Sequence, residues 1–436
     1  MKQTSLVRAV ILFGVLVASR SASAADIPYR SFSGSATMGP QAEAFAAKLA
    51  ALSNLALGSG NAVRFVKLPG LPPIPSRFGG SMVAAVAAGT NAGGFDAAYI
   101  SGTDINKAWG FIYNSGVPFG PRFDEFTGFL YGKAAAGGQS SGLELMQSIL
   151  DARRQNVVAI PIVASSEQLS GWFPLPLGNN DAHYRGIGLA GLCQQRWTLR
   201  YLPPGEYVLG KACDTLVAER VIAAKNIRFI AAVPGGGSLV EAVRSGQLQG
   251  FEFATPLDDV SQLFATADNP GTVGVRFVHT PGWHQEFLIT WMLINKDVWS
   301  SLSPAQQALT SSVARDHVLS SYGESMQRQG DALRFILGAN RADSNRDNDI
   351  VLSEWPERDQ QRLSRATNQV LNERTVDPSL PAEDRQDLFT ILETLRKYVR
   401  ANILYWTVRG PRRELRLERW TSPTGEPWLD DAPRDR

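Results

Sequence analysis

Apolar and polar positions repeat with two different periods along the first two-thirds of the chain. In three segments the apolar residues recur every three to four positions, which predicts amphipathic helices, and in three others they alternate or run together as in strands. Helices that alternate with strands predict an α/β fold. Beyond Trp299 the pattern is almost entirely helical, with a helix start at Ser303-Pro304-Ala305. The earlier helical segments are 40–54, 81–89 and 141–152, and the strand segments are 63–68, 95–100 and 157–163.

The first 24 residues have the three regions of a secretory signal peptide. Lys2 and Arg8 supply positive charge, residues 9–18 are apolar, and Ala22-Ser23-Ala24 is a cleavage site of the small-x-small kind. We expect cleavage after Ala24 and export to the periplasm, and the alternative is a buried N-terminal helix. No later segment approaches the roughly 20 uninterrupted apolar residues that a transmembrane helix requires.

Length and charge limit what the exported part can be. The roughly 410 remaining residues exceed what one hydrophobic core usually serves, which predicts two lobes or domains. A net charge of +2 and 19% charged residues give no electrostatic reason for binding nucleic acid. The charge is uneven, because the segment beyond about Ala339 is rich in Arg, Asp and Glu.

The sequence contains two cysteines, Cys193 and Cys213. In an exported protein we expect them to form a disulfide, which would stabilise the fold by roughly 3 kcal/mol in the chain-entropy model. The alternative is a pair of buried free thiols. A zinc site is not expected, because the Cys-x-x-Cys spacing is absent and the four histidines are scattered.

Several short segments share their order and spacing with one family. They are Tyr99 in Ala97-Ala98-Tyr99, 116–120 (GVPFG), 167–173 (EQLSGWF), 241–246 (EAVRSG), 252–256 (EFATP) with Asp259, 281–284 (PGWH) and 294–303 (INKDVWSSLS). Over roughly residues 27–335 the chain resembles the DctP-like solute-binding proteins of tripartite ATP-independent periplasmic (TRAP) transporters. It looks closest to the branch that binds 2-oxo acids and similar monocarboxylates.

This resemblance implies an α/β fold of two lobes, a type II-like periplasmic-binding-protein clamshell with a long bridging helix. We expect lobe 1 over residues 25–150, with a later crossing segment, and most of lobe 2 over 151–255. Residues 256–335 would contain crossing segments and the long helix. Residues 336–436 would form a helical C-terminal extension.

The resemblance also places a carboxylate-binding arginine at Arg200. A small carboxylate that leaves water needs a permanently charged, bidentate donor in place of its hydration shell. The segment around Arg200 departs from the family, because the usual Gly-Leu-Lys lead-in is absent and Arg196 is a nearby alternative. The other interpretation of Arg200 is an exposed surface residue.

A bound cation is a second feature that the resemblance implies. The matching positions are Gln168, Glu252, Phe253 and the acid expected after Gly-Trp-His, where Gln285 stands and Glu286 follows one residue later. One carboxylate with neutral oxygens suits a hard cation such as Na⁺ or Ca²⁺. Phe253 replaces the family's tryptophan, so both departures put the cation in doubt.

Four aromatic residues are candidates for the wall of the cleft, where large rings would exclude water and strengthen the arginine contact. They are Tyr99, Phe253, Trp172 and Trp283, and for Trp172 we favour a place in the core.

Residues 343–354 match a calcium-binding EF-hand loop at positions 1, 3, 5, 8 and 12. Asn348 stands where that loop normally has glycine. Helical patterns flank the segment, and we favour a polar connector between two helices.

The expected function is capture of a small organic acid in the periplasm for a TRAP transporter, whose membrane permease subunits would be the partners. No cofactor is required by this function, and a homodimer stays open. The motifs Gly-x-Ser-x-Gly and His-Glu-x-x-His are absent, so no catalytic residue is assigned. The alternatives are a binding protein for an ABC importer or sensor kinase, a periplasmic enzyme of unknown type, and a structural envelope protein.

Overall fold

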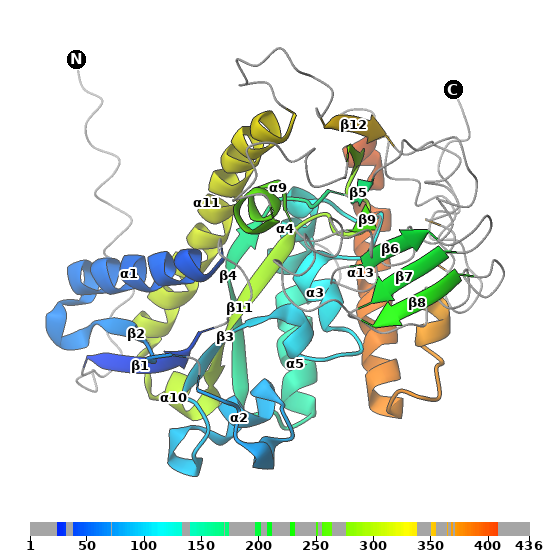
Figure 1. Cartoon of the computed structure of the whole chain (residues 1–436). Helices are drawn as coiled ribbons and strands as arrows, with labels where there is room; N and C mark the ends of the chain where they lie inside the picture. Colours follow the sequence, from blue (N-terminus) through cyan, green and yellow to red (C-terminus); the bar gives the residue numbers. More distant parts are fainter. Residues whose placement is uncertain are drawn as a thin grey trace.

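Two β-sheets, each with its own helices, organise the chain into two lobes (Figure 1). The computed structural model describes residues 24–31, 38–70, 72–132, 140–169, 171–173, 197–201, 207–211, 227–231, 250–251, 255–263, 276–337, 350–354, 364, 368 and 371–408. Of residues 197–201, 207–211, 227–231 and 250–251 the backbone alone is described.

The sheet of the first lobe has five strands in the order β2-β1-β3-β11-β4. β1 pairs in parallel with β2 and β3, whereas β11 runs antiparallel to both β3 and β4. The strands are β1 (Ala25–Arg30), β2 (Val63–Lys67), β3 (Ala97–Ser101), β4 (Val157–Ser165) and β11 (Leu288–Asn295).

Alternate residues of the central strands pack into two different cores. In β11 Met292 and Ile294 face one core, and Trp291 and Leu293 face the other, as the two-residue period of a strand requires. The long helices α1 (Met38–Leu57) and α11 (Pro304–Ile336) cover the first face. The second face is covered by α2 (Met82–Ala88), α3 (Gly110–Ser115), α4 (Phe123–Tyr131) and α5 (Gly142–Ala152).

The sheet of the second lobe has seven strands in the order β12-β10-β5-β9-β6-β7-β8. Most neighbours in it are antiparallel, but β7–β8 and β10–β12 are parallel pairs. The strands are β5 (Trp172–Phe173), β6 (Trp197–Tyr201), β7 (Tyr207–Lys211), β8 (Ile227–Ala231), β9 (Gly250–Phe251), β10 (Phe277–Thr280) and β12 (Val351–Glu354).

The chain passes between the two lobes after β4 and again before β11, and it does so twice more, from α11 to β12 and from β12 to α13 (Ala382–Val408). β4 belongs to the sheet of the first lobe, so the first crossing falls at residues 166–171 and not at residue 150 as expected from the sequence. The second crossing falls at residues 281–287, between β10 and β11. These first two crossings lie beside α11.

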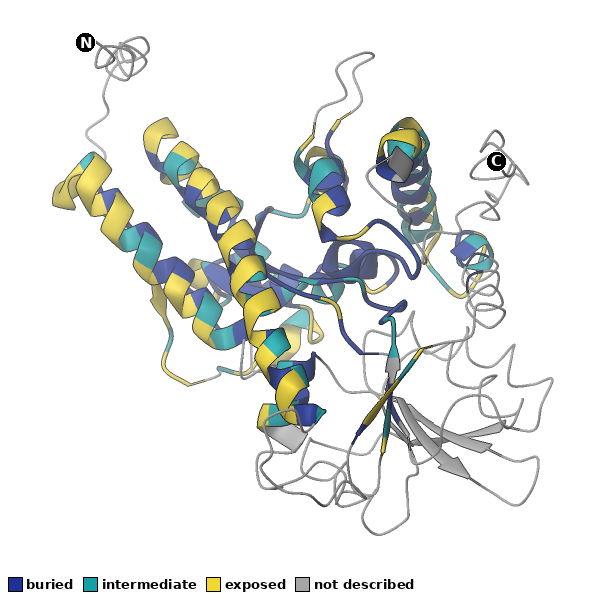
Figure 2. Ribbon diagram, turned by 90° about the horizontal axis from the view of Figure 1, so that it is seen from above, coloured by how far each residue is buried: buried dark blue, intermediate teal, exposed yellow. Residues whose placement is uncertain are grey.

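The helix α11 begins at the expected position and covers the open edge of β4. Ser303 accepts a hydrogen bond from the Gln306 amide in a capping box, with proline at the first helical turn. Further along, Ser321 and Ser325 accept hydrogen bonds from the backbone amides of Ala164 (2.9 Å) and Ser166 (3.1 Å). Figure 2 shows the exposed outer faces of the two long helices and the buried strands beneath them.

The C-terminal extension contains a helix that completes the core of the first lobe. Leu388, Ile391, Leu395 and Val399 of α13 (Ala382–Val408) recur at helical spacing and are fully buried among residues of α4 and α5. The extension is not wholly helical, however, because it also contributes β12 to the other sheet.

β12 also corrects the interpretation of residues 343–354. An EF-hand needs a helix after its loop, whereas Val351–Glu354 form a strand that pairs with β10. The segment is therefore not a connector between two helices at its C-terminal end. Residues 343–349 lie outside the described residues, as does the expected signal peptide up to residue 23.

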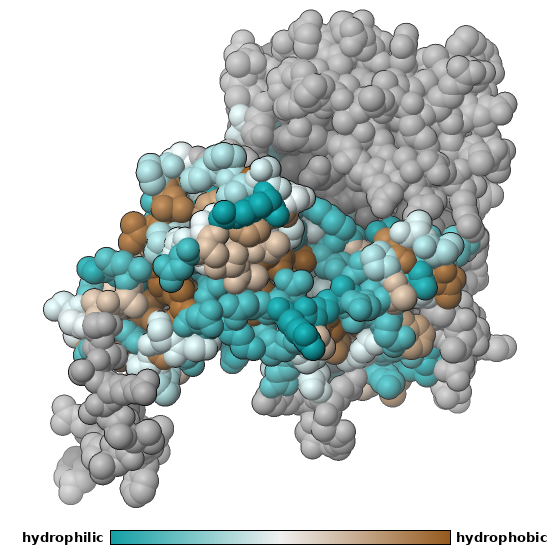
Figure 3. Space-filling model, turned by 90° about the horizontal axis from the view of Figure 1, so that it is seen from below, coloured by the Kyte–Doolittle hydropathy of each residue, from teal (hydrophilic) through white to brown (hydrophobic). Residues whose placement is uncertain are grey.

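No helix among the described residues is long and apolar enough to cross a bilayer. On the face shown in Figure 3, apolar patches are small and separated by hydrophilic side chains.

Arg153 joins α13 to the first lobe through two ion pairs. Its guanidinium lies 2.8 Å from Asp384 and 2.5 Å from Asp387, and the three side chains are 16–20% exposed. Burial raises the pKa of Asp387, although the Arg153 cation opposes this rise. Arg153 thus favours the charged form of Asp387 beside the core.

Replacing Arg153 should destabilise the protein. We expect Arg153→Gln to lower the free energy of unfolding by about 2–4 kcal/mol at neutral pH, because two partly buried carboxylates lose their cation. The deficit should shrink as pH falls through the raised folded-state pKa of Asp387, because a protonated carboxyl no longer needs the cation. Urea denaturation measures both effects. The exposed pair Arg64–Asp26 provides the control, since Arg64→Gln should cost about 1 kcal/mol or less; equal losses in the two variants would contradict the prediction.

Candidate functional site

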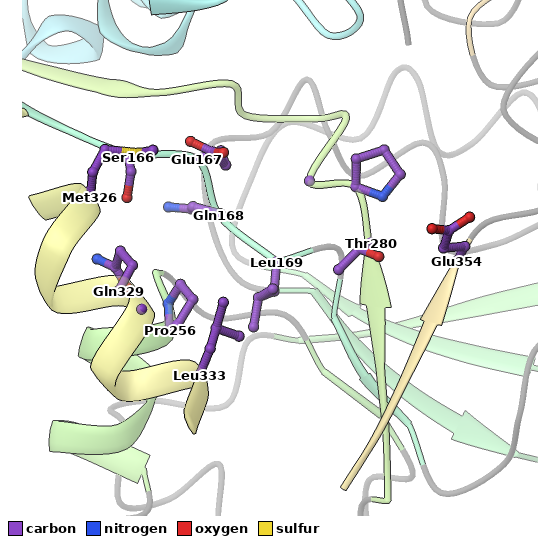
Figure 4. A pocket seen from close by; sticks show the side chains of 13 residues that line it. Ser166, Glu167, Gln168, Leu169, Pro256, Thr280, Met326, Gln329, Leu333 and Glu354 are labelled. Carbon is purple, nitrogen blue, oxygen red and sulfur yellow. The ribbon is translucent and has the colours of Figure 1, made fainter. Parts of the chain in front are cut away.

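A cavity of about 450 Å³ lies where the chain crosses between the lobes. Three segments meet there: the residues after β4, the residues between β10 and β11, and the second half of α11 (Figure 4). Its lining residues are Ser166, Glu167, Gln168, Leu169, Pro256, Thr280, Pro281, Gly282, Met326, Gln329, Gly330, Leu333 and Glu354.

The backbone at this cavity continues the pairing of β4 with β11. Ser165 lies opposite Leu288, and the amide of Gln168 donates to the carbonyl of Gln285 (3.3 Å) in the same register. Residues directly opposite each other in an antiparallel pair share a face. Gln168 and Gln285 therefore lie on one face of this two-stranded ribbon.

Both glutamine side chains are buried, Gln168 with 7% and Gln285 with 4% of its surface exposed. Neither side-chain amide forms a hydrogen bond with a described residue. Gln168 projects into the cavity in Figure 4, where its amide is available to a ligand or ion.

Gly282 makes this close approach of the two crossings possible. A Cβ atom on Gly282 would lie 1.7 Å from the carbonyl oxygen of Gln168, far inside contact distance. Only glycine fits there, because the obstacle is backbone that a side-chain rotation cannot move. The peptide bond before Pro281 is cis.

Continued beyond the end of β4, the same register places Glu286 opposite Glu167. Burial is the main cause that raises the pKa of the Tyr322 hydroxyl, and the carboxylates of Glu167, Asp124 and Glu286 add to this rise. Glu167 lines the cavity together with Gln168, whereas Glu286 is not among the described lining residues, and its role as a cation ligand stays a prediction. The position beside Gln168 belongs to Gln285, so an amide takes the place where the family resemblance expects an acid.

The aromatic candidates lie in packed surroundings. Tyr99 is fully buried, and its hydroxyl donates to the carbonyl of Met38 (3.0 Å) and bonds with Thr290 (2.7 Å). Trp172 is fully buried and donates to Asp259 (2.8 Å), in agreement with a place in the core.

Trp283 lies next to the cavity-lining Gly282. Its ring stacks on Phe119 with centroids 5.0 Å apart, and 2% of its surface is exposed. The indole N–H has no hydrogen-bond partner among the described residues. The Trp283 N–H is thus a buried donor at this crossing without a described partner.

Other predicted residues lie outside the described part of the chain. Arg200 is in β6, paired with Val208 of β7, but its side chain is not described. Glu252 and Phe253 are outside the described residues, between β9 and α9 (Pro256–Asp258), and so are Arg196, Cys193 and Cys213.

The contribution of α11 to the cavity is not expected from the sequence. Met326, Gln329 and Leu333 line it at spacings of three and four, and the carbonyl oxygen of the Gln329 side chain accepts a hydrogen bond from the Leu257 amide (2.7 Å). That periodicity identifies one face of a helix, but only the position of the crossings identifies that face as a binding surface.

The described lining is mostly apolar and neutral, with Glu167 and Glu354 as its acids. Among the described residues no three His, Cys, Asp or Glu side chains gather to hold a metal ion. Amide oxygens such as that of Gln168 suit a hard cation, and the roles of Gln168 and Glu286 as cation ligands stay predictions.

The sequence matches no protein-family model and no curated protein sequence. Solved structures are similar in fold. A TRAP transporter solute-binding protein from Bordetella bronchiseptica, with calcium and picolinate bound in its active site, has a TM-score of 0.59 and 15% identity over 89% of this chain and 94% of its own.

Two further TRAP periplasmic solute-binding proteins are similar. One from Colwellia psychrerythraea, with bound calcium and pyruvate, has a TM-score of 0.57 and 15% identity over 89% of this chain and 100% of its own. One from Pseudoalteromonas atlantica, with bound sodium and pyruvate, has a TM-score of 0.56 and 14% identity over 89% of this chain and 99% of its own. The chain therefore has the fold of the TRAP periplasmic solute-binding proteins, which confirms the two-lobed α/β architecture expected from the sequence.

Proposed function

We propose that this protein is a periplasmic solute-binding protein that captures a small organic acid for a TRAP-type uptake transporter. The observation that supports this most is the likeness in fold to such proteins over 89% of the chain. The cavity at the crossing between the lobes, lined by Gln168, agrees with a binding role.

The ligand is proposed to be a 2-oxo acid or a similar monocarboxylate. Similar structures contain pyruvate or picolinate, and each of these ligands has one carboxylate. Arg200 would hold that carboxylate as a bidentate charged partner. Phe253 and Trp283 would exclude water around it.

A hard cation would accompany the ligand. Gln168 would give its amide oxygen, and Glu252 and Phe253 would complete the set. Replacement of the second acid by Gln285 lowers the negative charge of the site, which favours Na⁺ over Ca²⁺ relative to a site with two carboxylates.

The mechanism would be capture by closure. A ligand that contacts both lobes would bind the closed state more tightly than the open state and would therefore stabilise closure. The permease would recognise the closed form. Rotation would occur at the two crossings beside α11, where Gln329 of α11 bonds to Leu257 of α9. Export to the periplasm and a homodimer belong to the same proposal.

A thermal-shift screen of the mature protein tests the proposed function. The panel contains 2-oxo acids, hydroxy acids, amino acids, sugars and polyols, each with and without Na⁺ and Ca²⁺. A ligand at 100 times its dissociation constant should stabilise the fold by about 2.7 kcal/mol. Stabilisation by 2-oxo or hydroxy acids alone is the expected result, and stabilisation by sugars alone would refute the proposal.

Removing the proposed arginine should weaken binding. Arg200→Ala is expected to cost about 2–5 kcal/mol of binding free energy, because the ligand carboxylate is left buried without its charged partner. Isothermal titration calorimetry with the acid found in the screen measures this loss. Arg196→Ala is the matched control and should bind normally; the reverse pattern would assign the carboxylate to Arg196.

Tyr99 should affect stability and not affinity. Tyr99→Phe leaves the Met38 carbonyl and the Thr290 hydroxyl without their buried partner, so we expect a loss of about 1–3 kcal/mol in unfolding free energy. The dissociation constant of the acid should stay within about twofold. Tyr29→Phe is a control in the same core, since the Tyr29 hydroxyl bonds to no described residue. A loss of affinity in Tyr99→Phe would return this residue to the wall of the cleft.

A further inference from the structure

A second cavity, of about 210 Å³, lies on the far edge of the five-stranded sheet. It is enclosed by the end of α4, the start of α5, the edge strand β4 and two helices, α10 (Lys296–Ser301) and α11. It shares no lining residue with the cavity at the crossings. Whatever binds there would not compete directly for Gln168.

The floor of this cavity is an apolar stretch of strand edge that offers few hydrogen-bond donors. Ala159, Ile160 and Pro161 are buried, and proline has no N–H. The Ala159 amide is already used, because it donates to the side chain of Gln147 (3.3 Å). Trp299 adds an aromatic wall.

Two hydrogen-bond donors lie at the cavity, one exposed and one buried. The Arg315 side chain is exposed; its guanidinium stacks over the Tyr131 ring, 4.8 Å from its centroid, and forms no ion pair with a described residue. The Tyr131 hydroxyl is buried and has no hydrogen bond to any described residue. Burial is the main cause that raises the pKa of Tyr131, so the hydroxyl keeps its proton at neutral pH.

The Arg315 guanidinium and the Tyr131 hydroxyl are both hydrogen-bond donors. A single carboxylate can accept hydrogen bonds from both of them. One carboxylate of the protein, Glu144, also lines the cavity, but it caps α5 by accepting from the Ser141 amide (3.0 Å). Its negative charge opposes a ligand with two carboxylates. The volume falls below the roughly 300–1,000 Å³ of sites for drug-sized ligands.

We propose that this cavity is a second ligand site, which binds a short monocarboxylate through Arg315 and the Tyr131 hydroxyl and packs its apolar or aromatic body on Ile160, Pro161 and Trp299. The proposal is independent of the function proposed for the crossings between the lobes. It concerns a different face of the first lobe and different residues.

Fluorine NMR with 4-fluorobenzoate as the probe tests this second site on the whole mature protein. The titration is performed on Arg200→Ala, so that the proposed cleft arginine is absent. We expect saturable binding that Arg315→Gln weakens at least tenfold and Tyr131→Phe weakens severalfold. The matched control is Arg334→Gln on the same helix, an exposed arginine paired with Asp331, which should bind as the parent does.

Thermal unfolding without ligand separates a binding role from a structural one. Tyr131→Phe removes a buried hydroxyl that has no partner, so the ligand-free variant should be as stable as the parent or more stable. Binding by Arg315→Gln equal to that of the parent, absence of saturable binding in the parent, or destabilisation of ligand-free Tyr131→Phe would each overturn the proposal.

Discussion

The antiparallel pairing of β4 with β11 is the constraint on which the rest of the structure depends. Both strands are buried almost throughout, and each leads directly into a crossing to the other lobe. If the pairing register of β4 with β11 shifted by one residue, every side chain of the shifted strand would turn to the other face of the sheet. Such a shift would exchange Gln168 with Glu167, or Gln285 with Glu286, so the same hydrophobic pattern that fixes the core also decides which polar groups are buried at the crossings.

The long helix α11 packs into the core with its first half and forms hydrogen bonds to the edge of β4 with its second half. Its first half packs Val313 and Ala314 into the core with α1, as an amphipathic helix does. Ser321 and Ser325 then supply acceptors for the amides at the end of β4, an edge that would otherwise be open. Polar residues on the inner face of a helix weaken its hydrophobic pattern, but here they complete the hydrogen bonding of a buried strand.

The sequence predicted the elements with strong local signals and missed those decided by tertiary contacts. The start of α11 at Ser303-Pro304 and the stop of α2 at Gly89 follow from cap chemistry, which is local. The strand β12 does not, because its pairing with β10 joins segments more than 70 residues apart. For the same reason the sequence alone does not show which face Glu286 occupies, because its orientation depends on the register of two distant strands. Gln168, in contrast, is buried and lines a cavity, at a position that the sequence marked as a candidate.

The position of α13 affects how the chain reaches its native state. This helix lies at the end of the described chain and yet supplies Leu388, Ile391, Leu395 and Val399 to the core formed by α4 and α5. The first lobe therefore cannot close its core during synthesis until α13 has been made. Until then Phe126 and Phe129, which the native fold buries, remain without part of their covering. Segments more than 250 residues apart in the sequence must meet to complete this core, and exposed apolar surface of this kind favours aggregation of partly folded chains.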